Sequence, residues 1–375
     1  MNICPEKAIS MKEDEYGFIY PVIDGEKCIA CRRCQKVCAF RGESVENAPI
    51  STYAAVSRDE KTRMLSSSGG MFAAMAEYMI GHGGIVIGAI MQEDFSVIHA
   101  AAEKQEDIRL LQGSKYTQSS TGDVYQKTAE YLADGKKVLF SGTPYQTAGL
   151  YGFLGRDYEN LLTVDIICHG VPGGRMFREY IELLGRKYGG RVEEFTFRDK
   201  SLGWGKNGSA LINNKRRKIW QNTSSYIYYF SRGWIFRDSC CSCRYSSRLR
   251  PSDITLGDYW GIEKQHPEYL DSGIWNENKG ISVVLANTGK GQEFLDGLKD
   301  LADLKSSRFS SAAAGNSALV CPVSAGKREE ILECYKNGGW ASVEQRFRKS
   351  IGLRYYSSQI KALLPERLRR KLKGR

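Results

Sequence analysis

The chain has 375 residues, of which 54 are Lys or Arg and 43 are Asp or Glu, so its formal net charge is +11. A hydrophobic content of 42% and a charged content of 26% are typical of an ordinary globular protein of two or three domains, and they exclude disordered and fibrous chains. The most apolar run, 84–91, is too short to span a bilayer and no signal peptide is visible, so we expect a cytoplasmic protein without a transmembrane segment. The positive charge would suit nucleic acid, an anionic membrane surface or an acidic electron-transfer partner, and charge alone does not choose among them. Because no nucleic-acid-binding motif accompanies it, we predict no nucleic-acid partner.

Four cysteines near the N terminus have the spacing of iron–sulfur ligands. Cys28, Cys31 and Cys34 lie three residues apart, and Cys38 follows after three spacer residues. Bacterial ferredoxins use this spacing to wrap thiolates around a 4Fe-4S cluster. A structural zinc site prefers two cysteine pairs separated by a dozen or more residues, and buried structural cysteines show no such period. The run therefore predicts a 4Fe-4S cluster, and eleven cysteines in all indicate a reducing compartment.

Cys4, which precedes Pro5, is predicted to supply the fourth ligand of this cluster. In two-cluster ferredoxins the cysteine before proline belongs to one run in sequence but ligates the cluster of the other run. By that rule Cys4 completes the set of Cys28, Cys31 and Cys34, and Cys38 would serve a second cluster whose other cysteines precede Met1. We therefore expect an N-terminally truncated module, one fully ligated cluster, and Cys38 as a ligand without its partners.

A small polar loop follows the module. Strands are predicted over 8–11 and 18–22, and the polar, aperiodic segment 42–60 is predicted to be a linker. Ser67, Ser68, Gly69 and Gly70 then precede a helix whose apolar residues recur from Met71 to Met79. Backbone N–H groups at such a turn can cradle a phosphate or pyrophosphate. The alternative is a simple serine N-cap beside closely packed small residues, and no dinucleotide-binding or Walker motif decides between the two.

The next part of the chain alternates strands and helices. This order predicts a parallel sheet covered by helices, whose ligands bind where the strands end. Gly142-Thr143 and Cys168-His169 each follow a predicted strand, so they are expected on the same rim. His169 is interpreted either as a proton donor or as a loop residue satisfied by the backbone. The predicted strands are 85–90, 138–140 and 161–167, and the predicted helices are 123–133, 145–154 and 175–188.

From Arg191 onward the pattern changes to short strands, predicted over 193–197, 210–212 and 281–286, with a basic turn over 215–218 and helices beyond Gly289. Cys240-x-x-Cys243 could be half a zinc site, a redox pair or part of a second cluster, and Cys168 is its candidate partner. The basic tail 351–375 carries leucines at helical spacing. We expect a terminal helix packed on its own domain, or weakly contacting a membrane surface or partner.

Six motifs, in this order, give the chain its resemblance to the coenzyme F420 hydrogenase/dehydrogenase beta-subunit family, over Cys4 to about Asp296. They are the ferredoxin run, Ser67-Ser68-Gly69-Gly70, Gly113-Ser114-Lys115-Tyr116, Ser141-Gly142-Thr143-Pro144, Ile167-Cys168-His169-Gly170, and Cys240-x-x-Cys243 followed by Asp253-Ile254-x-x-Gly257-Asp258. We accordingly predict a chain of the α+β and α/β classes: a ferredoxin-like module (1–41), a linker (42–60), a mixed α/β flavin domain with helices on a largely parallel sheet (61–190), a C-terminal α+β domain (191–350) and a basic helical tail (351–375).

The resemblance implies an iron–sulfur flavoprotein oxidoreductase that relays electrons between a 4Fe-4S cluster and FAD, with hydride exchange to F420 or another carrier. The expected partner is a redox protein, such as a ferredoxin or an oxidoreductase subunit, or a small-molecule hydride carrier. The implied FAD contacts are Ser67, Ser68, Gly69, Gly70, Lys115, Tyr116, Gly142 and Thr143.

One position departs from the family. The family typically has cysteine where this chain has Tyr145, and that cysteine would join Cys168, Cys240 and Cys243 as the ligands of a further cluster. With three thiols left, a second cluster at this place is uncertain. The alternative function is a non-catalytic electron-transfer or scaffold subunit associated with polysaccharide biosynthesis.

Overall fold

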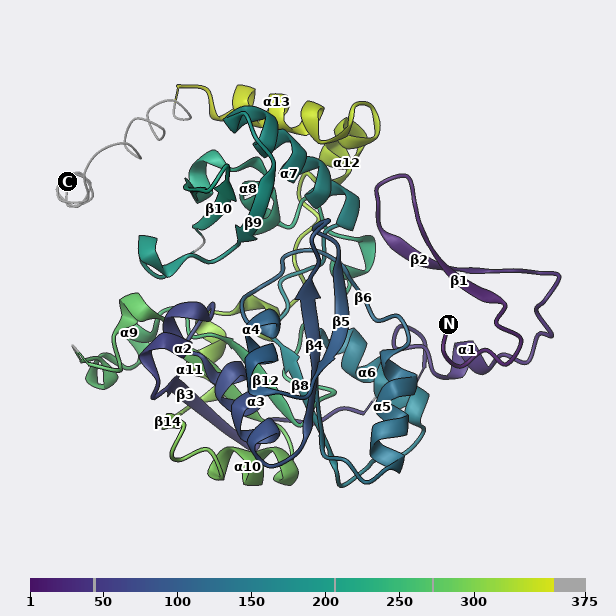
Figure 1. Cartoon of the computed structure of the whole chain (residues 1–375), viewed down its shortest axis with the longest axis vertical. Coiled ribbons are helices and arrows are strands. Elements are labelled where there is room, and N and C mark those ends of the chain that lie inside the picture. Colours follow the sequence, from purple (N-terminus) through teal and green to yellow (C-terminus); the bar gives the residue numbers. More distant parts are fainter. Residues whose placement is uncertain (43–44, 206, 272, 354–375) are drawn as a thin grey trace.

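The computed structural model describes residues 1–42, 45–205, 207–271 and 273–353. Figure 1 shows a lower body built around one large sheet, an upper part made of helices and a small sheet, and a hairpin that projects from the side. None of the described helices combines the length and the apolar character needed to cross a membrane. The basic tail predicted over 351–375 lies, from residue 354 on, outside the described residues.

The large sheet is parallel in its middle and antiparallel toward its edges. β12, β8, β7 and β4 run parallel to one another, whereas β13, β3 and β14 on one side and β5 on the other pair antiparallel with their inner neighbours. Across the sheet, the strands described are β14 (Ala302–Ser307), β3 (Ser51–Ser57), β13 (Ser282–Ala286), β12 (Ile254–Asp258), β8 (Leu161–Ile166), β7 (Val138–Gly142), β4 (Ile85–Met91), β5 (Val97–Ala102) and β6 (Ser119–Ser120).

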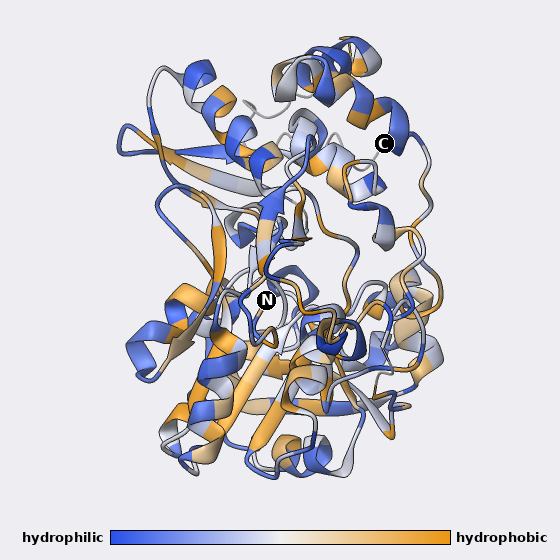
Figure 2. Cartoon of the chain, turned by 90° about the vertical axis from the view of Figure 1, so that its right-hand side faces the viewer, coloured by the Kyte–Doolittle hydropathy of each residue, from blue (hydrophilic) through white to orange (hydrophobic). Residues whose placement is uncertain are grey.

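Helices cover both faces of this sheet. Successive residues of a strand point to opposite faces, so a strand covered on both sides is a continuous apolar run, as in Val138-Leu139-Phe140. Leu139 packs with Met75 under one layer, and Phe140 packs with Leu150 under the other. Figure 2 shows the resulting hydrophobic ribbons in the lower body. One layer contains α3 (Met71–Gly81) and α10 (Gly289–Asp296), and the other contains α5 (Val124–Ala133) and α6 (Pro144–Leu154).

The upper part has its own aromatic core. Phe177, Phe197, Tyr226 and Trp340 are buried together between a small antiparallel sheet and four helices. These elements are β9 (Val192–Thr196), β10 (Gly208–Ile212), β11 (Lys215–Ile219), α7 (Gly174–Tyr188), α8 (Ser225–Arg232), α12 (Arg328–Lys336) and α13 (Gly339–Ile351). The short helices α2 (Glu60–Leu65), α4 (Ile108–Leu111), α9 (Ile262–Gln265) and α11 (Phe309–Ala314) lie around the large sheet.

The N-terminal module consists of the hairpin β1 (Ile9–Glu13) and β2 (Ile19–Ile23) with α1 (Arg33–Lys36), and it is docked on the body. Phe18 is buried in the aromatic core of the upper part. The amide side chain of Gln118 bonds both the N–H and the C=O of Ile19, at 2.8 and 3.0 Å, as a neighbouring strand would. Arg175 donates to the Asp14 carbonyl at 3.1 Å. The hairpin is therefore fixed by the burial of Phe18 and by hydrogen bonds from side chains of the body to the hairpin backbone.

Three predicted features differ from the structure. The segment predicted as a linker contains β3, which is paired on both sides within the large sheet. The predicted basic turn at 215–218 is the edge strand β11, whose charged residues are exposed. Beyond Gly289 the chain contains a strand, β14, as well as helices. β3 and β14 depend on pairing with distant residues, which the local pattern does not reveal, whereas β11 pairs with the adjacent strand β10 across a short turn.

The domain boundary predicted at residue 190 does not separate two sheets. β12, β13 and β14 come from the second predicted domain, yet they complete the sheet that begins in the first. Arg250, which immediately precedes this part, donates to Asp165 at 2.9 Å, and both side chains are almost wholly buried. A buried ion pair thus joins the two halves of the sequence inside one body.

We expect removal of one member of this pair to be costly, because a buried charge is left without its partner. Asp165→Ala should lower the free energy of unfolding by about 3–5 kcal/mol. The double variant Asp165→Leu/Arg250→Met should lose less than Asp165→Ala alone, since no charge remains buried. Urea denaturation measures both values. Glu46→Ala, which breaks the exposed pair with Arg244, is the control and should cost about 0–1 kcal/mol.

Candidate functional site

A cavity of about 480 Å³ opens where the parallel strands end. β7, β8 and β12 terminate at its floor, so the segments that follow them form one wall, as expected for an open α/β sheet. Of the predicted site residues, those that line the cavity are Ser67, Ser68, Gly70, Lys115, Tyr116, Gly142, Thr143, Cys168 and His169. The cavity therefore brings together motifs that are spread over about a hundred residues of sequence.

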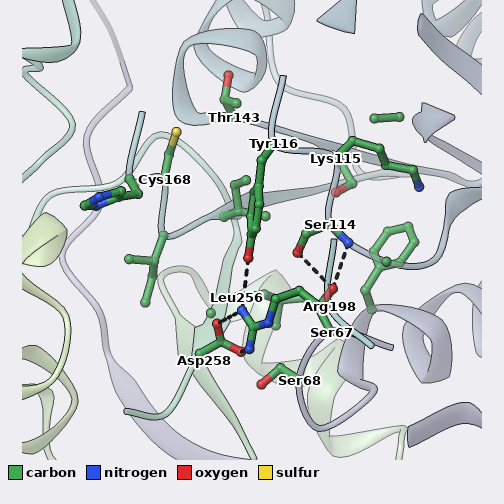
Figure 3. A pocket seen from close by; sticks show the side chains of 18 of the residues that line it. Ser67, Ser68, Ser114, Lys115, Tyr116, Thr143, Cys168, Arg198, Leu256 and Asp258 are labelled. Atoms are coloured by element: carbon green, nitrogen blue, oxygen red, sulfur yellow. Dashed lines mark hydrogen bonds and ion pairs between the residues drawn. The ribbon is translucent and has the colours of Figure 1, made fainter. Parts of the chain in front are cut away.

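The loop 66–70 and the loop 113–117 are joined by hydrogen bonds. Ser67 Oγ accepts from the Ser114 backbone N–H at 2.7 Å and interacts with the Ser114 hydroxyl at 2.8 Å (Figure 3). Gly70, with φ of 89°, is the N-cap of α3, and Gly70, Met71 and Phe72 at this end of the helix line the cavity. Gly69 does not line the cavity. A Cβ there would collide with the Ala55 carbonyl oxygen, so this glycine is required by packing against β3.

Arg198, which sequence reasoning missed, lies at the centre of the cavity wall. Its guanidinium donates to the Tyr116 hydroxyl at 3.0 Å and to the Asp258 carboxylate at 2.8 Å (Figure 3). Its side chain is 2% exposed, and its Nε is buried without a hydrogen-bond partner among the described residues. Tyr116 is itself stacked on Phe230, with ring centroids 4.3 Å apart. No motif marks Arg198, because its partners come from distant elements.

Two further cations are buried beside the same loop. Lys200 donates to the carbonyls of Arg63 and Ser68, and burial, with repulsion from Arg198, lowers the pKa of its amine to about 7. Arg63 is also buried and donates to the Arg58 carbonyl at 2.9 Å. Within the described part of the chain neither Arg63 nor Lys200 forms an ion pair, and Asp258 pairs with Arg198 alone. Arg63 therefore leaves an excess of buried positive charge beside the loop, and Lys200 adds to it when its amine is protonated, below about pH 7.

His99 and Lys115 form the opposite wall. His99 Nε2 bonds the Ser141 carbonyl at 3.1 Å, whereas its buried Nδ1 has no partner among the described residues. Burial lowers the pKa of His99 to about 4, so the ring is neutral near pH 7. The Lys115 ammonium donates to the carbonyls of Leu110, Leu111 and Gln112 at 2.9–3.0 Å. Lys115 was predicted as a cofactor contact, but its amine caps the C-terminal end of α4 instead. In Figure 3 its side chain points away from Tyr116.

Cys168 and His169 follow the end of β8 and line the cavity. Burial raises the pKa of Cys168 to about 12, with smaller contributions from Cys240 and Cys243, so these three thiols are electrostatic neighbours. His169 Nε2 lies 3.3 Å from the Ser231 carbonyl oxygen, and its ring meets Phe236 edge to face. Across the described ranges, no three His, Cys, Asp or Glu side chains converge closely enough to hold a metal ion.

Tyr145 lies between the thiol groups and the N-terminal module. It is the second residue of α6, and it follows the cavity-lining residues Gly142 and Thr143 after one intervening proline, Pro144. Burial, the charge of Cys243 and a hydrogen bond to the Cys243 side chain raise the pKa of Tyr145 above its ordinary value. At this position, where the family typically has cysteine, the Tyr145 hydroxyl therefore contacts the thiol of Cys243.

The N-terminal cysteines are carried by a short module with an irregular backbone. Cys28 and Cys31 are exposed, and Cys4, Cys34 and Cys38 are partly buried. Ala30 and Arg32 adopt the left-handed conformation, with φ of 54° and 58°, which is uncommon for residues with a Cβ. The N–H of Ala8 donates to Cys4 Sγ at 3.3 Å. Burial lowers the pKa of the Met1 amino group, and the nearby Cys4 and Cys34 oppose this shift.

Comparison with known proteins gives matches over most of the chain. Two family models describe the beta subunit of coenzyme F420 hydrogenase/dehydrogenase: residues 52–125 match the model of its N-terminal part, and residues 135–311 match the model of its C-terminal part. Residues 1–41 match a 4Fe-4S dicluster domain. Among solved structures, a chain of the F420-reducing NiFe hydrogenase complex from Methanosarcina barkeri, studied by xenon derivatization, is 17% identical, with a TM-score of 0.49 over 78% of this chain and 94% of that chain. No curated protein matches the chain.

The buried amine of Lys115 predicts a pH dependence of stability. Burial lowers its pKa from 10.5 to about 7, so between these values the unfolded chain binds one proton more than the folded protein. The contribution of this group to the free energy of unfolding therefore rises from pH 7 toward pH 10. We expect wild-type protein to gain stability relative to Lys115→Met over this range in urea denaturation. The exposed residue Lys127 supplies the control, because Lys127→Met should show no such trend between pH 7 and pH 9.

Proposed function

The chain belongs to the coenzyme F420 hydrogenase/dehydrogenase beta-subunit family and has a 4Fe-4S domain at its N terminus, and from this premise we propose that it is an iron–sulfur flavoprotein oxidoreductase. In this proposal it relays electrons between a 4Fe-4S cluster and FAD, and it exchanges hydride with F420 or another carrier. Its redox partner is a protein such as a ferredoxin or an oxidoreductase subunit. We place it in the cytoplasm, where a reducing environment preserves thiolate ligands.

The observation that carries the FAD proposal is the excess of buried positive charge beside loop 66–70. Buried cations without counter-charges are unfavourable unless an anion neutralises them. Arg198 has an unpartnered buried Nε, and the N-terminus of α3 presents backbone N–H groups to the same cavity. Both features favour a pyrophosphate. Ser67, Ser68 and Gly70 would hold it from the loop, and Arg198 would hold it from the opposite side.

The other end of the cavity fits a neutral aromatic ring system with N–H groups. His99 is neutral, and its Nδ1 is an acceptor without a partner among the described residues. The aromatic Tyr116 ring is held by its stack on Phe230. A bound flavin supplies the chemistry of accepting a hydride as two electrons and releasing electrons singly. His169, whose ring is fixed by Phe236 and the Ser231 carbonyl, is the proposed proton donor in this cavity.

The N-terminal donor set fits a 4Fe-4S cluster in its chemistry. Cys4, Cys28, Cys31 and Cys34 supply four thiols within one small module, and thiolates are the ligands that such clusters require. The Ala8 N–H that donates to Cys4 Sγ would stabilise this sulfur as a thiolate, since hydrogen bonds to ligand sulfurs tune iron–sulfur sites. Cys38 remains a proposed ligand of a cluster that needs further thiols.

Anaerobic purification with FAD tests the proposal, because the protein should then show oxidised-flavin absorption and about four irons per chain. Arg198→Met should weaken FAD binding roughly tenfold or more, since it removes a buried charged hydrogen-bond donor. Fluorescence titration of the apoprotein with FAD measures this affinity. Arg216→Met, at an exposed pair with Glu194, is the matched control and should bind FAD as the wild type does.

Two outcomes would change the assignment. A colourless protein that binds zinc tightly and takes up no flavin would refute the iron–sulfur flavoprotein. Stoichiometric flavin without hydride exchange to F420 or a nicotinamide would instead support an electron-transfer or scaffold subunit.

A further inference from the structure

The N-terminal module exposes apolar side chains out of proportion to its size. Its first 42 residues contain six of the fifteen large hydrophobic side chains that are exposed in the described part of the chain. Three of them, Val22, Ile23 and Ile29, are 41, 52 and 62% exposed, and they lie in the run 21–33, in which every residue is exposed. Figure 1 shows the segment that joins β2 to α1 at the outer edge of the module. Exposed apolar side chains gathered in one place mark an interaction surface.

The opposite side of the module is the one that packs on the body. Phe18 is buried in the aromatic core of the upper part, and Phe40 stacks on Tyr145 of α6 with ring centroids 4.0 Å apart. The run 21–33 is therefore turned away from the body. It contains Cys28 and Cys31, both exposed, so the loop that carries these predicted cluster ligands lies on the outward side.

Most acidic side chains of the module are engaged in contacts. Glu13 pairs with Arg178 of the body at 2.9 Å, and Glu15 pairs with Lys336 of the body at the same distance. The Asp14 carboxylate accepts from the backbone of its own turn, and Asp24 pairs with Lys27 at 3.1 Å. Glu26 is the acidic residue of the run 21–33 without such a contact from its carboxylate among the described residues.

The cations, in contrast, remain unpaired on the outward side. The segment 27–42 contains no Asp or Glu and five cations, which are Lys27, Arg32, Arg33, Lys36 and Arg41. Arg32, Arg33 and Lys36 are exposed, and none of them forms an ion pair within the described residues. Positive charge thus borders the exposed apolar residues. An apolar centre with a charged rim is the usual composition of a protein–protein interface, and complementary charge speeds the encounter of two proteins.

We propose that the exposed run 21–33 together with Lys36, here called the outward surface, docks a small acidic electron-transfer protein. Val22, Ile23 and Ile29 pack against the partner, while Arg32, Arg33 and Lys36 attract its carboxylates. Each encounter passes one electron between the redox centre of the partner and the N-terminal cluster, so one of them is oxidised as the other is reduced. Redox encounters of this kind use small interfaces, which a surface of this size can supply. The inference rests on the proposed function for the cluster, but it does not depend on FAD.

The association rate with an acidic two-cluster 4Fe-4S ferredoxin, immobilised as the probe, tests the charges of the outward surface. At low ionic strength Arg33→Glu/Lys36→Glu should lower the association rate of the reconstituted full chain by about tenfold or more. The difference should shrink as salt is added, because the Debye length falls from about 30 Å at 0.01 M to about 8 Å at 0.15 M ionic strength. The matched control is Lys215→Glu/Lys218→Glu on the exposed face of β11, which changes the net charge equally and should associate nearly as the wild type does.

The apolar part of the surface predicts a different kinetic effect. Val22→Ser/Ile23→Ser should speed dissociation from the same ferredoxin several-fold and leave the association rate and its salt dependence unchanged, since short-range packing acts on the bound complex. Iron per chain, measured for each variant, shows whether the module is intact. If the charge-reversal variant loses its iron, the comparison of Val22→Ser/Ile23→Ser with wild type decides.

Three results would overturn the docking surface. One is wild-type protein that binds the ferredoxin no faster than Arg33→Glu/Lys36→Glu does. Another is an equal loss in Lys215→Glu/Lys218→Glu, which would show that only the net charge matters. The last is binding to phosphatidylserine vesicles, but not to the ferredoxin, that Arg33→Glu/Lys36→Glu abolishes, because this would assign the surface to a membrane.

Reduction by dithionite separates this inference from the proposed function. Dithionite needs no protein docking surface, so the wild type and Arg33→Glu/Lys36→Glu should both be reduced by it. A wild-type chain that takes up no iron or flavin would refute the proposed function, whereas the binding comparison would still test the outward surface. A chain that dithionite reduces and that exchanges electrons with the ferredoxin equally well after Arg33→Glu/Lys36→Glu would refute the surface alone.

Discussion

The cavity depends on one buried ion pair that joins the two sheets of the molecule. Arg198 follows β9 of the small sheet, and Asp258 is the last residue of β12 in the large sheet. Their charged groups meet at 2.8 Å in a place from which water is largely excluded. Burying two charges costs more than their attraction returns unless further hydrogen bonds help, and here the Tyr116 hydroxyl supplies one. The pair therefore fixes the position of the small sheet relative to the large one.

The same arrangement explains why the cavity is positively charged. Asp258 balances Arg198, but Lys200 and Arg63 are satisfied by backbone carbonyls instead of carboxylates. Carbonyl oxygens can accept hydrogen bonds from a cation without cancelling its net charge. The field of these side chains then extends into the cavity, where the low dielectric preserves it. An anionic ligand gains from this field, and its binding would also stabilise the folded protein by mass action.

Sequence reasoning found the features whose signal is local and missed those that arise from long-range pairing. The helices α3, α6 and α7 and the strands β7 and β8 were predicted close to their observed bounds, because apolar periodicity and glycine ends mark them. β3 and β14 were missed because they are stabilised by pairing with each other across about 250 residues. Spacing alone predicted the N-terminal cysteines. Arg198 and His99 could not be predicted in this way, because each stands outside any motif. Only the fold shows that they are buried and which distant residues they contact.

Helix α6 contacts both the N-terminal module and the cavity. Val37 of the module packs so closely on Gly152 that a Cβ there would lie 2.6 Å from the Val37 carbonyl oxygen. Two turns earlier on the same helix, Phe40 stacks on Tyr145, and the preceding residues Gly142 and Thr143 line the cavity. The module thus contacts α6 near both of its ends, at Tyr145 and at Gly152, and the start of the same helix adjoins the wall of the ligand site. Because interiors are close-packed, a change of module position would be transmitted through α6 to the cavity and to Cys243, whose side chain is hydrogen-bonded to Tyr145.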